Sequence, residues 1–216
     1  MRGSLIGFIV IVICGIVIAF FMISDNENLA IINPVKIDEK LVDPELQNVM
    51  SGHRIGSFKL VNQFGDTITQ HDFEGKIYVA DFFFTTCPGI CKAMAVQMKR
   101  VQDANSGQLD FKIVSHSVTP EMDQPAILLD YALRNGADPE IWQLTTGNRN
   151  EIFDLARKSY FAASLEIGGD EDDMVHTENF VLVDKERRIR GIYDGTSNEE
   201  VDQLISDIEI LRKSYE

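Results

Sequence analysis

Two cysteines, Cys87 and Cys91, lie four residues apart in the stretch FFFTTCPGIC. The apolar run before them predicts a buried strand, and the residues after them predict a helix that begins at Pro88 or Ile90. A thiol at a strand–helix junction lies near unpaired backbone N–H groups and the positive end of the helix dipole, which favour the thiolate. With Cys91 inside the helix, the two thiols lie about one turn apart, so that metal chelation and disulfide formation are both open to them. Two buried structural cysteines are the alternative, but that alternative does not account for their position at this junction.

A third ligand of intermediate softness, in addition to Cys87 and Cys91, would favour metal binding over redox chemistry as the function of the two thiols. The chain has four histidines, and His176 is the best candidate because it precedes the predicted strand FVLVD, where a loop presents side chains over the end of a sheet. Two thiolates and an imidazole form a three-coordinate set suited to Cu(I). Zn²⁺ would also accept this set together with a water molecule, so the ligand types alone do not identify the metal.

The elements that must position these residues follow from the hydrophobic pattern. The run IYVADFFF, residues 77–84, is typical of a central strand that is buried on both faces. Further strands are predicted at residues 58–61, 67–69, 110–115, 180–184 and 189–193. Helices are predicted from residue 88 or 90 to 102, and at residues 125–135, 150–160 and 199–213. This order predicts an α/β domain whose mixed sheet is flanked by helices, and a thioredoxin-like fold is the best match.

The N-terminal region is different in character. Leu5 to Ile23 form an uncharged run of 19 residues, and a helix of about that length spans the hydrocarbon core of a membrane. We therefore expect one transmembrane anchor at residues 1–24, a tether at residues 25–54 and a folded domain at residues 55–216. Arg2 precedes the run and acidic residues follow it, so the positive-inside rule predicts a single-pass protein whose C-terminal domain is extracytoplasmic, in the periplasm where there is one.

Composition excludes several classes of protein. The chain has 216 residues and a formal net charge of −14, which argues against nucleic acid as a partner because phosphates require Lys and Arg. Three cysteines are too few for a small disulfide-rich fold. A hydrophobic content of 44% is sufficient for a packed core, so the chain is not disordered as a whole.

Four segments together resemble the Sco/SenC family of membrane-anchored, thioredoxin-like copper chaperones for cytochrome c oxidase assembly. They are FFFTTCPGICKAM, SVTPEMDQP, Trp142-Gln143-Leu144-Thr145 and VHTENFVLVD, and they follow the order seen in that family. The resemblance implies that Cys87, Cys91 and His176 bind copper, as Cu(I), Cu(II) or both. It also implies delivery of copper to the dinuclear copper site of oxidase subunit II, with subunit II or its assembly factors and a copper donor protein as partners. One position departs from the family pattern S-V-D-P-x-x-D, because Thr119 replaces the first Asp while Asp123 is kept.

The same cysteines also allow other functions. In an extracytoplasmic thiol–disulfide oxidoreductase, which is the main alternative, Cys87 would attack the substrate and Cys91 would resolve the mixed disulfide. The resemblance to the Sco/SenC family implies one such activity, which is reduction of the cysteines that will form the copper site of the oxidase. A thiol peroxidase is a third, weaker hypothesis. A metallochaperone would not be an enzyme in the ordinary sense.

Overall fold

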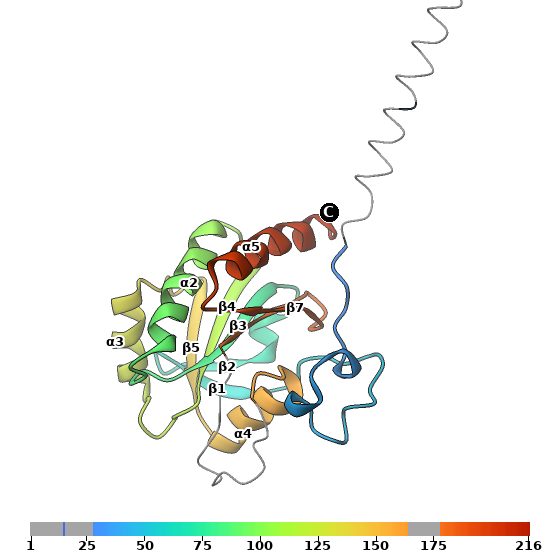
Figure 1. Cartoon of the computed structure of the whole chain (residues 1–216). Helices are drawn as coiled ribbons and strands as arrows, with labels where there is room; N and C mark the ends of the chain where they lie inside the picture. Colours follow the sequence, from blue (N-terminus) through green and yellow to red (C-terminus); the bar gives the residue numbers. More distant parts are fainter. Residues whose placement is uncertain (1–14, 16–27, 164–177) are drawn as a thin grey trace, which may run out of the picture.

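The computed structural model describes residue 15, residues 28–163 and residues 178–216. Within these residues the strands form one seven-stranded sheet in the order β2-β1-β5-β4-β3-β6-β7 (Figure 1). The strands are β1 Lys59–Asn62, β2 Thr67–Thr69, β3 Ile77–Phe83, β4 Phe111–Ser117, β5 Trp142–Thr146, β6 Asn179–Val183 and β7 Ile189–Asp194. The helices are α2 Ile90–Ala104, α3 Pro125–Asn135, α4 Arg149–Asp154 and α5 Asn198–Lys213, with short 3-10 helices at Pro34–Lys36, Glu39–Leu41 and Gln70–Phe73 and a π-helical segment at Leu155–Ser159.

β3 is the central strand, and all seven of its residues are buried. It pairs in parallel with β4 on one side and antiparallel with β6 on the other, and β4 pairs in parallel with β5. The sheet is therefore mixed, which confirms the predicted α/β arrangement. The apolar composition of IYVADFFF follows from this position, because a strand covered on both faces cannot alternate with polar residues.

Each face of the sheet carries its own hydrophobic core. Ile77, Val79 and Phe83 of β3 pack in one core with residues of α2, α3 and α5. The intervening residues Tyr78 and Phe82 pack in the second core, with residues of α4 and of the segment before β1. Figure 1 shows α2 and α5 lying together over the first face. Successive residues of β3 thus pack on opposite faces of the sheet.

Two elements differ from the sequence prediction. β5 was not predicted as a strand, and it fills the position between β1 and β4. The helix predicted at 150–160 is α-helical only to Asp154, after which the backbone widens into the π-helical segment and Phe161 adopts a φ of 54°. The sequence gives little warning of the wider turn, since Ile152, Phe153, Leu155 and Ala156 keep an apolar helical spacing.

Residues 28–55, which we call the N-terminal strap, lie against the domain. The Ile32 amide donates to the Ile189 carbonyl at 2.9 Å, and the Ile55 amide donates to the Arg187 carbonyl at 2.9 Å. Val42 is buried in the second core. The segment expected to be a tether is therefore in contact with β7 and the turn before it.

The predicted membrane-spanning run, residues 5–23, lies outside the described residues except for Gly15. Within the part of the chain that is described, no helix is long and apolar enough to cross a membrane. The anchor thus stays a prediction from the sequence.

Candidate metal centre

The two cysteines lie on the turn between β3 and α2. Helix α2 begins at Ile90, the later of the two predicted starts, and Gly89 takes the N-cap position. Cys91 is therefore the second residue of the helix, while Cys87 lies in the turn before it and its amide donates to the Phe84 carbonyl at 3.3 Å. This places Cys87 beside the exposed N–H groups of the first helical turn, as the sequence predicts.

Both thiols are free and largely covered, with exposed fractions of 8% for Cys87 and 2% for Cys91. The two thiols lie in the same core cluster and interact, since hydrogen bonding from the Cys91 thiol contributes to lowering the pKa of Cys87. Two neighbouring thiols can chelate one metal ion or be oxidised to a disulfide. Neither reaction requires the cysteines to be brought together from distant parts of the chain.

The two thiols differ in acidity. Burial raises the pKa of Cys87, but the Cys91 thiol, the amides of Cys91 and Gly89, and the Lys92 ammonium outweigh burial, so the pKa lies below its usual value. Burial raises the pKa of Cys91 to about 12, with further contributions from Cys87 and the Asp81 carboxylate. Cys87 is therefore the thiol that loses its proton more readily, while Cys91 stays protonated at neutral pH.

A buried carboxyl group lies beneath the turn. Asp81 is the one acidic residue of β3, it is 4% exposed, and it accepts a hydrogen bond from the Ser115 hydroxyl. Ser115 in turn accepts from the Trp142 indole N–H at 2.8 Å. Burial raises the pKa of Asp81 to about 7, because one neutral hydrogen bond does not compensate for the lost hydration. The charge of this carboxylate acts on Cys91 and on the phenol of Tyr131, raising the pKa of both.

A second carboxylate, that of Asp123, holds the turn from the other side. Asp123 is fully buried and accepts hydrogen bonds from the Thr85 amide at 3.1 Å and from the Thr85 hydroxyl. It also accepts from the hydroxyls of Ser117 at 2.6 Å and Thr119 at 3.0 Å. One side chain thus joins the cysteine turn, the end of β4 and the loop after β4. Thr119, which departs from the family pattern, is a neutral donor to the carboxylate that the family keeps.

The proposed third ligand, His176, lies outside the described residues. The other three histidines lie elsewhere in the domain. His53 bonds to the Ser159 carbonyl at 2.8 Å, His71 pairs with Glu74 at 2.8 Å, and His116 is fully buried with its ring 5.1 Å from that of Phe82. Within the described residues no group of three or more His, Cys, Asp or Glu side chains could hold a metal ion. The described donor set is thus the pair of thiols, whose soft sulfur atoms fit a copper ion.

Sequence reasoning missed Asp81 and did not assign a role to Asp123. A single carboxylate inside the apolar run IYVADFFF is the signal that could have identified Asp81, since a charge in a doubly covered strand is rare without a partner or a function. Met94 and Met98, which have helical spacing, are buried in the first core.

The family model SCO1/SenC matches residues 48–212. The SCO1 protein homolog of Bacillus subtilis is 32% identical over 158 residues, which cover 72% of this chain and 81% of that protein. A solved structure of BsSco, described as a member of the Sco family of cytochrome c oxidase assembly proteins with a disulfide switch, is 30% identical with a TM-score of 0.63 and covers 74% of this chain and 93% of its own. The copper-bound structure of Arabidopsis thaliana ScoI is 25% identical with a TM-score of 0.59 and covers 73% of this chain and 98% of its own.

The match to the family model extends over the sheet, the cysteine turn and nearly all of the closing helix, and it agrees with the sequence motifs and with the thioredoxin-like fold. The chain belongs to the SCO1/SenC family.

Proposed function

We propose that this protein is a copper-binding chaperone that acts in the assembly of cytochrome c oxidase, delivering copper to the dinuclear copper site of subunit II. In this proposal it is held in the membrane by residues 5–23, with the folded domain on the extracytoplasmic side. The observation that carries the proposal is the pair of neighbouring, free thiols on the β3–α2 turn, one of which has a lowered pKa. Membership of a family with copper-bound structures and members named for oxidase assembly supports it.

The proposed ligands are Cys87, Cys91 and His176. Copper meets the Cys87 thiolate first, because its pKa is the lower of the two. Binding of Cys91 then releases a proton, since a thiol must be deprotonated to coordinate a metal. Delivery proceeds by ligand exchange, in which donor groups of the acceptor protein replace these ligands one at a time. A copper donor protein loads the site by the same exchange in reverse.

The experiment is a copper titration of the purified, fully reduced chain without oxygen, with wild type compared to His176→Ala and Cys87→Ser. We expect tight one-to-one binding that both substitutions weaken. His71→Ala is the matched control, since His71 lies on the surface in a pair with Glu74. Binding that His176→Ala leaves unchanged would remove the histidine from the ligand set, and weak binding by wild type would refute the chaperone proposal.

Thiol–disulfide exchange is the second candidate, and the difference between the two thiols favours it. A nucleophilic cysteine with a lowered pKa next to a covered partner is the arrangement that attack and resolution require. In this case Cys91→Ser traps a mixed disulfide with the substrate, while His176→Ala keeps most of the exchange activity. The two candidates are compatible, because copper loading requires both thiols to be reduced.

A further inference from the structure

The end of the sheet opposite the cysteines forms a distinct surface, which we call the base. It consists of the loop at residues 105–110, the β6–β7 turn at residues 184–188 and the C-terminal end of α5. Asp110 joins these segments. Its carbonyl accepts from the Ile77 amide at 2.9 Å, and its carboxylate pairs with Lys185 at 2.9 Å and with Arg212 at 3.4 Å.

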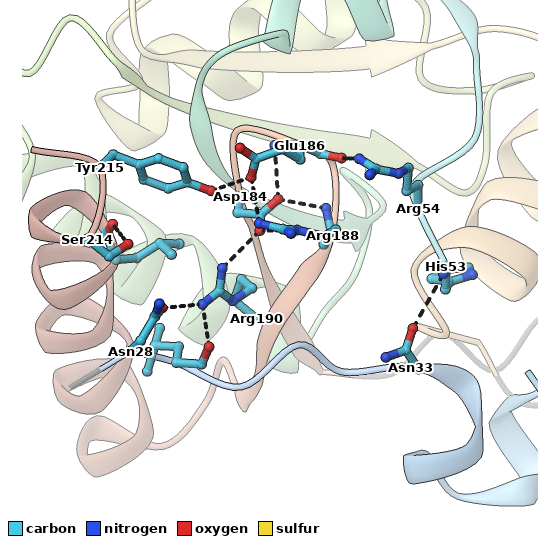
Figure 2. A network of polar contacts seen from close by, with 12 residues as sticks. Asn28, Asn33, His53, Arg54, Asp184, Glu186, Arg188, Arg190, Ser214 and Tyr215 are labelled. Atoms are coloured by element: carbon cyan, nitrogen blue, oxygen red, sulfur yellow. Dashed lines mark hydrogen bonds and ion pairs between the residues drawn. The ribbon is translucent and has the colours of Figure 1, made fainter. Parts of the chain in front are cut away.

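The N-terminal strap reaches the domain at this base. Figure 2 shows Arg190 of β7 directed toward Asn28, with which it forms a hydrogen bond of 2.6 Å, while the same guanidinium donates to the Leu29 carbonyl. The buried carboxylate of Asp184 fixes Arg190 at 3.0 Å. A backbone bond from Ile32 to Ile189 continues the attachment along β7. The first described residues of the strap are therefore held in place by side-chain and backbone contacts together.

The length of chain before this attachment is short. Five residue steps separate Ile23, the last residue of the predicted membrane-spanning run, from Asn28, and they extend at most about 17 Å. The cysteines lie at the other end of the domain. Ile189 is level with Val183 of β6 and thus with Tyr78 of β3, so the cysteine turn begins about 16 Å further along the strand direction.

The base also carries an exposed apolar tip. Leu109 is 88% exposed, the highest value among the exposed large hydrophobic residues of the described chain. Lys76 donates to its carbonyl at 2.8 Å, and Lys112, whose ammonium donates to the Glu140 carbonyl, lies just past the loop at the start of β4. A single exposed leucine is ordinary on a protein surface. Here lysines of neighbouring segments lie at the same end of the domain, where the predicted anchor enters, and lysine near an apolar side chain suits the headgroup region of a membrane.

We propose that the base of the domain rests on the lipid surface of its own membrane, with Leu109 in the headgroup region and Lys76 and Lys112 near the lipid phosphates. The cysteine turn then faces away from the membrane, toward a partner whose metal-accepting site stands above the lipid surface. This inference rests on the proposed membrane attachment and adds an orientation to the proposed function.

The test places a fluorescent reporter at each end of the domain. The full-length, reduced chain is reconstituted in vesicles of phosphatidylcholine and phosphatidylglycerol whose acyl chains are brominated near the headgroup, because bromine quenches tryptophan that lies close to it. Leu109→Trp and Gln108→Trp report from the base. Met122→Trp is the matched control, since Met122 is also exposed but lies at the cysteine end, next to Asp123. The native Trp142 is common to all three variants and to wild type, whose signal is subtracted.

We expect the added fluorescence of L109W and Q108W to be mostly lost in brominated vesicles and that of M122W to be kept. Equal quenching at both ends, stronger quenching of M122W, or no quenching at either end overturns the proposal. Failure of wild type to sediment with the vesicles overturns it too, together with the membrane attachment. All measurements are made without copper, so a failure of the copper function is detected separately, by the titration described above.

Discussion

Removal of the Asp123 carboxylate is the sharpest test of how the cysteine turn is held. The carboxylate accepts one amide and three hydroxyl hydrogen bonds from Thr85, Ser117 and Thr119, and it is fully buried. In Asp123→Ala these donors lose their acceptor in a place that water does not readily reach. A hydrogen bond to a charged group contributes about 1.5 to 3 kcal/mol, and bonds that share one acceptor are not additive.

We therefore expect Asp123→Ala to lower the free energy of unfolding by about 3 to 5 kcal/mol, the range of large effects from breaking a buried network. Asp123→Asn keeps the shape and one acceptor oxygen, and the hydroxyls can rotate to accept from the new amide, so we expect a loss of about 1 to 3 kcal/mol. The measurement is urea unfolding of the reduced, copper-free protein at neutral pH. Asp130→Asn is the control, because Asp130 pairs with Arg134 on the exposed side of α3 and its loss changes stability by about 0.5 kcal/mol or less.

The same variants test whether the network positions Cys87 or only stabilises the fold. Thr85 lies two residues before Cys87, and its backbone is held by Asp123. In Asp123→Asn, under conditions where the protein stays folded, we expect the rate of Cys87 alkylation and the copper affinity both to change, whereas Asp130→Asn leaves both unchanged. A loss below about 1 kcal/mol in Asp123→Ala would refute the argument, since that is the value of a single neutral hydrogen bond.

Three further predictions concern the groups around the turn. Because burial raises the pKa of Asp81 to about 7, the folded state binds this proton more tightly than the unfolded chain, and stability falls as the pH rises from about 4 to about 7. The free energy of unfolding of wild type should therefore drop by about 2 to 3 kcal/mol between about pH 5 and pH 8, relative to that of Asp81→Asn. Equal pH profiles for the two proteins would contradict this prediction. Iodoacetamide should modify Cys87 well before Cys91 at neutral pH, because the pKa of Cys87 is lowered and that of Cys91 is raised to about 12. Peptide mass mapping over time measures the order of modification. Faster modification of Cys91 would contradict the inference that Cys87 is the more reactive thiol. Thr119→Asp replaces a hydroxyl donor to Asp123 by a second carboxylate. We expect this substitution to destabilise the protein by about 1 to 2 kcal/mol at neutral pH and by less in acid, because the two carboxylates repel each other when both are charged. Urea unfolding at both pH values measures the difference.

The sequence predicts the elements that have a strong local pattern. The run IYVADFFF gives β3, the two cysteines mark the following turn, and an apolar helical period gives α5. Pro125 and Gly136 bound α3 within the range expected, because proline favours the first helical position and the left-handed φ of 67° at Gly136 ends the helix.

The structural features that a local sequence pattern does not predict depend on contacts between residues far apart in the chain. β5 is a strand because β1 and β4 offer partners on both sides, and a five-residue segment carries little signal of its own. The Asp123 network joins Thr85 of the cysteine turn to residues 117–123, and sequence spacing reveals only the part within 117–123. The N-terminal strap depends on Arg190, which lies more than a hundred residues after the segment that it holds. Each of these features requires the folded topology before it can be recognised.

The cysteine turn shows how the two proposed activities, metal delivery and thiol exchange, would share one site. Cys91 is covered by the first core and influenced by Asp81, so its pKa of about 12 keeps it protonated at neutral pH. The Cys91 sulfur thus loses its proton only when it binds copper or forms a disulfide bond. Copper binding to both sulfurs would then release at least the proton of Cys91, so the copper affinity should rise with pH in the neutral range. Oxidation to the disulfide removes the same proton and blocks the metal. In the proposed function, the redox state of Cys87 and Cys91 would therefore decide whether the protein can accept copper, and a reductant that acts on this pair would control its loading.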